Sequence, residues 1–339
     1  NSTYMIGLES YTLAVFLLVI TMLSWGSWAN TQKLVSGDKW PFQLYYWDYS
    51  LGIILMALLF GLTVGSLGET GRGFTEDLLQ ASAYAILFAI LGGAVFNLAN
   101  ILIVAAIDIA GMAIAFPIGI GIALVEGTII NYIAEPAGNP VLIFTGVTLV
   151  TIAIIIDAIA YRRLPQQDSS TSTKGIVISI VGGLLMGLFF YLVQVSIAFD
   201  FSNPEPGKML PFAAVFVFSI GLFLSNFLWN SWAMAKPFSG DKVKYSQYFS
   251  DGNTKRHLVG LLGGAIWCIG MVLSNYTSEV AGDAISYGLG QGATMVAAIW
   301  GVFIWKEFKD APKGTNTLLT FMFLFFLVGL GLLIYARVA

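Results

Sequence analysis

Acidic residues inside long apolar stretches are the first candidates for chemistry in this sequence. Asp48 and Glu126 both stand in such stretches, where a charge is costly and usually serves a function. A carboxyl group in this setting can carry a proton across a barrier. We therefore predict a proton-coupling role for both residues, although Asp48 also fits an interfacial residue bonded to a tyrosine or to the end of the first helix. Asp157 lies close to Arg162 and Arg163, and we expect it to pair with them.

Amides and large aromatic rings occupy the same apolar stretches. An amide without a partner is expensive in hydrocarbon, and ring faces with a few fixed hydrogen bonds bind a neutral polar solute well. Helix–helix contacts are the alternative role for the amides, and an interfacial belt is the alternative for the rings. The predicted substrate-binding residues are Trp25, Trp28, Tyr46, Asn97, Asn100, Gln194, Asn226, Trp229, Asn230, Trp267, Tyr287 and Gln291.

The sequence has too few cysteines and histidines for several other kinds of site. Cys268 is the only cysteine and His257 the only histidine, so a disulfide within the chain is impossible and a Cys/His zinc site or a Cys–His nucleophile is disfavoured. The net charge of −3 offers no basic face to nucleic acid. We expect neither an enzyme nor a resident metal or cofactor, and no nucleic-acid partner.

The composition is that of a membrane protein. Of the 339 residues, 57% are hydrophobic and 10% are charged, against about 25% charged in a soluble domain. A membrane helix needs about 20 apolar residues, and we predict ten. The predicted segments are Tyr11–Gln32, Phe42–Gly65, Leu78–Ala105, Ala110–Ile133, Val141–Tyr161, Gly175–Phe199, Leu210–Ala235, Leu258–Ser278, Ala284–Trp305 and Thr315–Tyr335.

Basic residues predict the orientation. With ten helices both termini share a side, and only Arg72, Lys208 and Arg337 lie on it. Cytoplasmic loops carry an excess of Lys and Arg, so we expect both termini outside the cell and the loops 162–174 and 236–257 in the cytoplasm. The protein would be a multi-pass protein of the cell inner (plasma) membrane. The basic residues on the other side are Lys33, Lys39, Arg162, Arg163, Lys174, Lys236, Lys242, Lys244, Lys255, Arg256, Lys306, Lys309 and Lys313.

An internal repeat relates the two halves. Leu91–Ile133 aligns with Leu262–Ile304 without a gap and keeps five glycines and one acidic position. The repeat unit then has five helices, so the second copy crosses the membrane in the opposite sense, as in many secondary transporters. We predict an all-α integral membrane protein of ten transmembrane helices in two inverted five-helix repeats. The predicted parts are residues 1–161, a cytoplasmic linker 162–174, and residues 175–339.

Glycines and a proline fall at matching places in the two repeats. Paired interruptions of this kind point to the binding site of a transporter, and close helix packing is the alternative. The predicted helix breaks are Pro117, Gly119 and Gly121 in the first repeat and Gly288, Gly290 and Gly292 in the second.

Several short motifs resemble known transporters. Trp25-Gly26-Ser27 resembles the glucose/ribose porters, and Asp48-Tyr49-Ser50, Gly92-Gly93 through Asn100, and Gly127–Tyr132 resemble the ureide permeases. Leu262-Gly263-Gly264 with Trp267, and Lys306-Glu307-Phe308, resemble the L-rhamnose–proton symporter. These families belong to the drug/metabolite transporter superfamily. The resemblance implies that helices one to four and six to nine line a cavity. It also implies that the fifth and tenth helices lie at the periphery, where a homodimer contact could form.

Taken together, the sequence predicts a secondary transporter. It would take up a small neutral polar solute, either a sugar such as ribose, glucose or rhamnose, or a ureide or nucleobase. The mechanism would be alternating access with proton coupling. The protein would be embedded in the lipid bilayer. The alternative is an exporter of lipophilic drugs or amino acids from the same superfamily.

Overall fold

The computed structural model is a bundle of apolar helices. It describes residues 4–35, 39–110, 112–165, 173–238 and 240–339. Within these ranges, ten helical stretches are long and apolar enough to cross a membrane, which confirms the predicted all-α class with ten membrane helices. Residues 166–172 of the predicted linker lie outside the described residues. The elements are α1 (Tyr11–Ser27), α2 (Ala29–Val35), α3 (Phe42–Leu62), α4 (Phe74–Gln80), α5 (Ala83–Ala110), α6 (Met112–Ala134), α7 (Pro140–Arg162), α8 (Thr173–Ser196), α9 (Pro211–Asn226), α10 (Trp229–Ala235), α11 (Tyr245–Ser250), α12 (Thr254–Tyr276), α13 (Ser278–Ala281), α14 (Asp283–Gly290), α15 (Ala293–Ile299), the π-helical turn η1 (Trp300–Ile304) and α16 (Thr315–Tyr335).

Polar caps fix where several membrane helices begin. The Ser10 side chain accepts a hydrogen bond from the Leu13 N–H at the start of α1. Asn139 caps α7 directly before Pro140, and Asn253 caps α12. A capping side chain satisfies backbone donors that the first turn leaves free. The apolar helices therefore start next to these polar residues.

The two helices α5 and α12 hold corresponding places in the two halves. Helix α5 packs along α8 and α9, while α12 packs along α1 and α3. A Cβ atom on Gly93 of α5 would lie 2.1 Å from the Phe218 carbonyl oxygen, and one on Gly264 of α12 would lie 1.8 Å from that of Tyr49. Only glycine permits such close backbone contact. The shared contact is compatible with the predicted inverted repeat, since Gly93 and Gly264 are equivalent in the sequence alignment.

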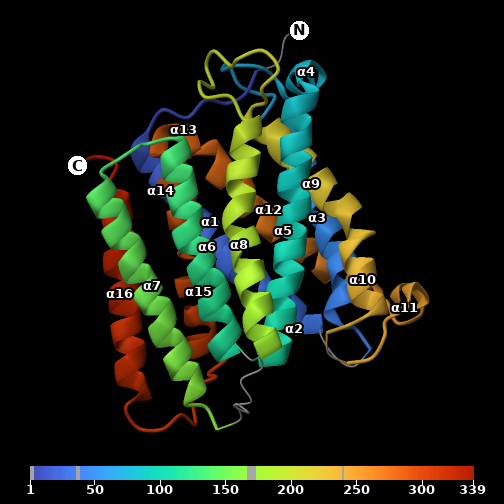
Figure 1. Ribbon diagram of the computed structural model, residues 1–339. Coiled ribbons are helices and arrows are strands. Elements are labelled where there is room, and N and C mark those ends of the chain that lie inside the picture. The colour runs from blue at the N-terminus through green and yellow to red at the C-terminus, as the bar shows by residue number, and fades with distance from the viewer. Residues whose placement is uncertain (1–3, 36–38, 111, 166–172, 239) are drawn as a thin grey trace.

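Helices α7 and α16 form a pair at one edge of the bundle (Figure 1). Gly146 and Gly329 face each other there, and a Cβ atom on either would lie 2.7 Å from the carbonyl oxygen of the other. Both chain termini lie at the end of the bundle that carries α4 and α13, and α2 and α11 lie at the opposite end (Figure 1). We call these the terminal end and the distal end.

Candidate functional site

A cavity of about 420 Å³ lies in the distal half of the bundle. Residues of α1, α2, α5, α6, α8, α12 and α15 line it. Gln32, Asp108 and Phe116 belong to this lining, and each lies near the distal end of its helix. The cavity therefore reaches towards the distal surface. Its volume is within the usual range for small-molecule pockets.

Stacked aromatic rings form one wall of the cavity. The rings of Trp25 and Trp267 lie 5.9 Å apart with an angle of 18° between their planes. The Trp25 indole N–H donates to the Trp267 carbonyl oxygen at 3.1 Å. Phe96 packs against Trp267 at 4.4 Å and against Phe189 at 5.0 Å. These contacts hold large ring faces in fixed positions, which suits a flat or partly apolar solute.

Amides supply fixed polar groups in the same cavity. Asn100 and Gln291 both line it and are both 8% exposed. The Asn100 amide nitrogen donates to the Tyr46 hydroxyl at 3.1 Å, which fixes the plane of this amide. The Gln291 backbone carbonyl accepts from the Thr294 hydroxyl. A solute beside the rings would thus meet the Asn100 amide, which Tyr46 holds in place, and the Gln291 side chain.

Only some of the predicted binding residues reach the cavity. Trp25, Trp28, Asn100, Trp267 and Gln291 line it. Tyr46 is buried behind Asn100 and contacts the site through that residue. The others lie elsewhere in the bundle, and the sequence does not separate the two groups. Those others are Asn97, Gln194, Asn226, Trp229, Asn230 and Tyr287.

Several of the remaining predicted residues join helices to one another. The Asn97 amide donates to the Leu222 carbonyl, the Ser225 hydroxyl and the Asn226 side chain at 2.8–3.2 Å. Gln194 donates to Asn275 at 3.2 Å. These bonds match the helix-packing alternative that the sequence left open for the amides.

Tyr287 and Asn230 also bond backbone groups of other elements. The Tyr287 hydroxyl donates to the Ala123 carbonyl at 2.7 Å, and Asn230 donates to the Gln43 carbonyl at 2.9 Å. Both residues are fully buried. Such bonds satisfy polar groups that would otherwise be costly in an apolar bundle.

The predicted helix break in the first repeat is wrong. Helix α6 runs continuously from Met112 to Ala134 through Pro117, Gly119 and Gly121. A proline removes one backbone hydrogen bond, and the rest of the helix continues. In the second repeat, by contrast, α14 ends at Gly290 and α15 begins at Ala293.

The second-repeat interruption adjoins the cavity. Gln291, which lines the cavity, stands in the gap between α14 and α15. A Cβ atom on Gly290 would lie 2.6 Å from the Trp25 ring, and one on Gly292 would lie 2.3 Å from the Met22 sulfur. Gly288 has more room, since its nearest neighbour is Leu333 at 3.4 Å. The small residues therefore let α1 approach the interruption closely.

The two acids predicted to couple protons lie outside the cavity lining. Asp48 is 2% exposed, and its two oxygens accept from the Tyr248 hydroxyl and face the His257 ring nitrogen at 2.9 Å. This contact joins α3 to α11 and α12, and it gives His257 a bonded position. Glu126 is half-buried beside Gly187, and its Oε2 has no hydrogen-bond partner among the described residues.

Sequence reasoning missed further cavity residues. Phe96, Ile103 and Ile107 lie on the same face of α5 as Asn100, at intervals of three or four residues, and all line the cavity. This helical spacing could have identified them once Asn100 was chosen. Asp108 also lines the cavity, although its place near the end of an apolar run is typical of a helix-end residue.

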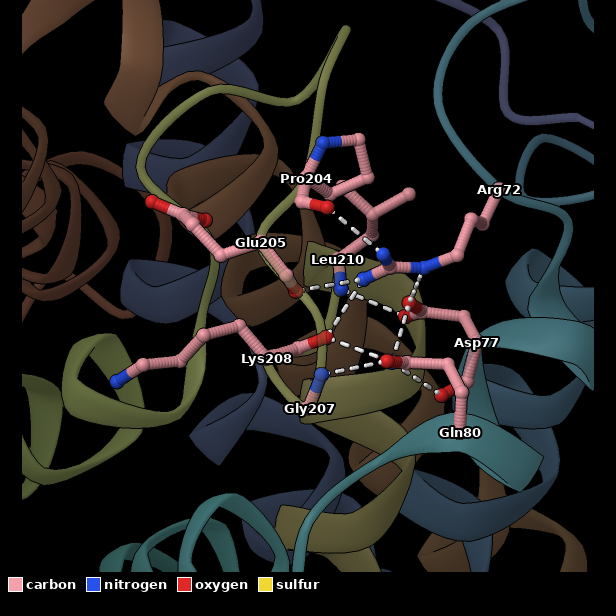
Figure 2. Close-up of polar contacts among 8 residues, drawn as sticks. All are labelled: Arg72, Asp77, Gln80, Pro204, Glu205, Gly207, Lys208 and Leu210. Atoms are coloured by element: carbon pink, nitrogen blue, oxygen red, sulfur yellow. Dashed lines mark hydrogen bonds and ion pairs between the residues drawn. The ribbon is translucent and has the colours of Figure 1, made fainter.

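A second polar region closes the terminal end of the bundle, and Figure 2 shows it. Asp77, which is 1% exposed, accepts from Arg72 at 2.9 Å and from the Leu210 backbone N–H at 2.6 Å. Arg72 also donates to the Lys208 carbonyl at 2.6 Å. Burial raises the pKa of the Asp77 carboxyl, and the donors from Leu210, Arg72 and Gln80 oppose that rise.

These bonds connect the two halves of the chain. Gln80 donates to the Lys208 carbonyl and accepts from the Gly207 N–H, both at 2.7 Å (Figure 2). Arg72, Asp77 and Gln80 belong to the connection between α3 and α5, whereas Gly207 and Lys208 belong to the connection between α8 and α9. We call this set the outer network. It fastens the terminal end, while the cavity lies in the distal half.

Comparison with known proteins identifies the family. A family model described as Ureide permease matches residues 45–172 and 161–336. The chain belongs to the ureide permease family. Ureide permease 1 of Arabidopsis thaliana is 23% identical, with 97% of this chain and 98% of the relative aligned. Ureide permease 2 of the same plant is 22% identical, with 96% and 97% aligned.

Other similar proteins extend this result. A Streptococcus pyogenes serotype M6 protein described as a "Putative sugar uptake protein" is 23% identical, with 88% of this chain and 91% of the relative aligned. A solved crystal structure has a TM-score of 0.61 at 14% identity and covers 95% of this chain and 96% of its own, which shows a shared fold. As a ureide permease family member with ten apolar helices, the chain is a multi-pass membrane transporter of small molecules.

Proposed function

We propose that this ureide permease family member takes up a small neutral polar solute, either a ureide or nucleobase, or a sugar such as ribose, glucose or rhamnose. The observation that carries the proposal is the cavity in which the stacked Trp25 and Trp267 rings lie together with Asn100 and Gln291. A ureide or nucleobase ring would stack on the indoles and pair its N–H and C=O groups with the amides. A sugar would use its C–H face and hydroxyls in the same way.

The distribution of basic residues supports uptake. The distal end carries Arg162, Lys174 and Lys306 among many others, and the positive-inside rule places such an end in the cytoplasm. The cavity would then face the cytoplasm, with the outer network closed on the external side. Uptake by alternating access requires a second state in which that network opens. The protein would reside in the cell inner membrane with both termini outside, and the α7–α16 pair would be available for a homodimer contact.

A binding screen on the purified full-length protein tests the proposal. The panel would contain allantoin as a ureide, uracil as a nucleobase, ribose and rhamnose as sugars, and lipophilic cations and amino acids as exporter substrates. A ligand that binds only the folded state at 100 times its Kd stabilises it by about 2.7 kcal/mol. We expect thermal stabilisation by a compound of the first three classes, and its loss in Trp25→Ala.

Two results would contradict this proposal. Stabilisation by lipophilic cations alone would favour the exporter, which the large aromatic surface of the cavity also admits. Stabilisation by a ureide or sugar that persists fully in Trp25→Ala would place the binding site outside this cavity.

A further inference from the structure

A cluster of ionisable groups lies at the distal end, outside the cavity, where α7 meets the segment after η1. The Tyr161 hydroxyl donates to Glu307 Oε2 at 2.5 Å, and Lys33 Nζ lies 3.0 Å from Glu307 Oε1. A Cβ atom on Gly301 would lie 3.0 Å from both Glu307 and Tyr161. The Glu307 carboxylate is thus bonded from α7 on one side and from α2 on the other.

Asp157 stands one turn before Tyr161 on α7 and is 6% exposed. Its Oδ1 is buried without a hydrogen-bond partner among the described residues. The basic residues predicted to pair with it, Arg162 and Arg163, are both exposed, and no described ion pair joins either of them to Asp157. The predicted pairing is therefore wrong.

The surroundings of Asp157 contain negative charge and no described cation in contact. Its carboxyl interacts electrostatically with Glu307 and with Tyr161. Helix α16, which packs along α7, carries no charged residue between Thr315 and Tyr335. A buried acceptor without a donor is rare and costly. A bound proton removes the charge and needs no further ligands, whereas a sodium ion would require several oxygen atoms around it.

We infer that Asp157, together with the adjacent Glu307, forms the binding site for the proton that drives transport. The proton would bind to one carboxylate oxygen of Asp157 and leave to the distal solution through Glu307, whose side chain is 30% exposed. This inference rests on the proposed function, since it names the coupling site of that transporter.

Contacts around Glu307 connect this site to the cavity. Lys33 follows Gln32, which lines the cavity, and Gly301 follows Ala297 of the cavity wall by one turn. The Lys33–Glu307 pair thus joins two walls of the cavity. A proton on the Asp157–Glu307 pair lowers the negative charge that faces Lys33 and so weakens the Lys33–Glu307 ion pair. Occupancy of the proton site and the shape of the cavity are linked in this way.

The other buried acids fit the role less well. Donors or a ring nitrogen occupy both oxygens of Asp48. Glu126 also has an unpartnered oxygen, but it is less buried, and no described bond connects it to the cavity wall. Glu126 is consequently the main rival for proton coupling.

The test uses the full-length protein in liposomes with radiolabelled allantoin. Counterflow exchange without a pH gradient tests the proposed function, because it needs no net proton movement. Substrate-induced alkalinisation of a weakly buffered external medium tests the proton site. We expect Asp157→Asn to keep exchange within about 3-fold of wild type and to lose alkalinisation and uphill accumulation, with Asp157→Glu restoring part of both. Alkalinisation that persists in Asp157→Asn, that is lost in Glu126→Gln instead, or that requires sodium would overturn the inference.

An infrared titration keeps the inference testable if allantoin is not a substrate. The purified wild type should show a carboxylic acid band that disappears between acidic and alkaline buffer, and Asp157→Asn should lack it. Glu307→Gln serves as the second variant if Asp157→Asn fails to fold, and it should shift this band. An unchanged band in both variants would contradict the site, whereas absent exchange in wild type with every compound tested would contradict only the proposed function.

Discussion

Asn97 and Asn100 lie three residues apart on α5, yet their side chains have different surroundings. Asn100 lines the cavity and bonds Tyr46, while Asn97 bonds groups of α9. An amide that contacts a bound solute affects affinity, and an amide that joins two helices affects folding stability. The pair therefore provides a direct test of the cavity as the binding site.

Replacing each amide by leucine should separate these effects. Asn100→Leu should weaken substrate binding by about 1–3 kcal/mol, roughly 5- to 150-fold in Kd, because the solute loses a hydrogen bond in a buried site. Asn97→Leu should lower the melting temperature and leave Kd unchanged. Calorimetric titration with the compound that stabilises the wild type measures the affinities, and thermal unfolding measures the stabilities. Equal loss of affinity in the two variants would argue against the assignment.

The sequence predicted the kinds of residue that line the cavity, aromatic rings and amides, but not which of them lie together. Trp25 and Trp267 are far apart in the chain and meet because α1 packs against α12. Asn97 and Asn100 are both amides on one apolar helix, and only the rotation of α5 against its neighbours separates them. That rotation depends on packing between distant segments, which a single sequence does not reveal.

Close glycine contacts are the main feature at the scale of helices. The Gly264 backbone touches α3, whereas a Cβ atom on Gly331 of α16 would have no other atom within 4 Å. Gly264→Ala should destabilise the protein by about 1–3 kcal/mol or more, since the backbones must separate. Gly331→Ala should stabilise it by about 0.5–1 kcal/mol, since alanine favours the helix. Thermal unfolding in detergent measures both, and equal melting temperatures would contradict the close contact.

The interruption between α14 and α15 offers a second test at this scale. Gly290→Leu should place a bulky group against the Trp25 ring and abolish transport, while the protein still inserts in the membrane. Gly331→Leu is the control, because its position is open. Uptake of labelled substrate and the amount of protein in the membrane are measured together. Normal uptake by Gly290→Leu would show that the interruption only packs helices.

Helix existence was predictable because long apolar runs admit few alternatives in a membrane. Breaks inside those helices were not, because glycine and proline permit a break without requiring one. Pro117 lies within the continuous α6, whereas Gln291 and Gly292 interrupt the matching stretch. Met22 and Trp25 of α1 lie against the glycines of the second repeat, and such contacts with a distant segment cannot be seen in the sequence.

Orientation in the membrane is a property of the whole molecule. Ser246 lies at the distal end and is exposed, and Leu67 lies at the terminal end and is 72% exposed. In a Cys268→Ser background, an impermeant thiol reagent added to intact cells should label Leu67→Cys and spare Ser246→Cys. Cys268 is fully buried, so its removal should not affect labelling. The reverse labelling pattern would overturn the orientation and the direction of transport.

In the proposed orientation, the outer network would also govern how much substrate the transporter needs outside the cell. If only a small fraction of molecules has the external side open at rest, the apparent Kd for external substrate exceeds the intrinsic value by the inverse of that fraction. Arg72 and Asp77 hold that side closed through charge-assisted bonds (Figure 2). Arg72→Lys, which loses the forked contacts, should therefore enlarge the open fraction and lower the half-saturating external concentration. The wild-type contacts would make the protein less responsive to scarce substrate while keeping the membrane sealed between transport cycles.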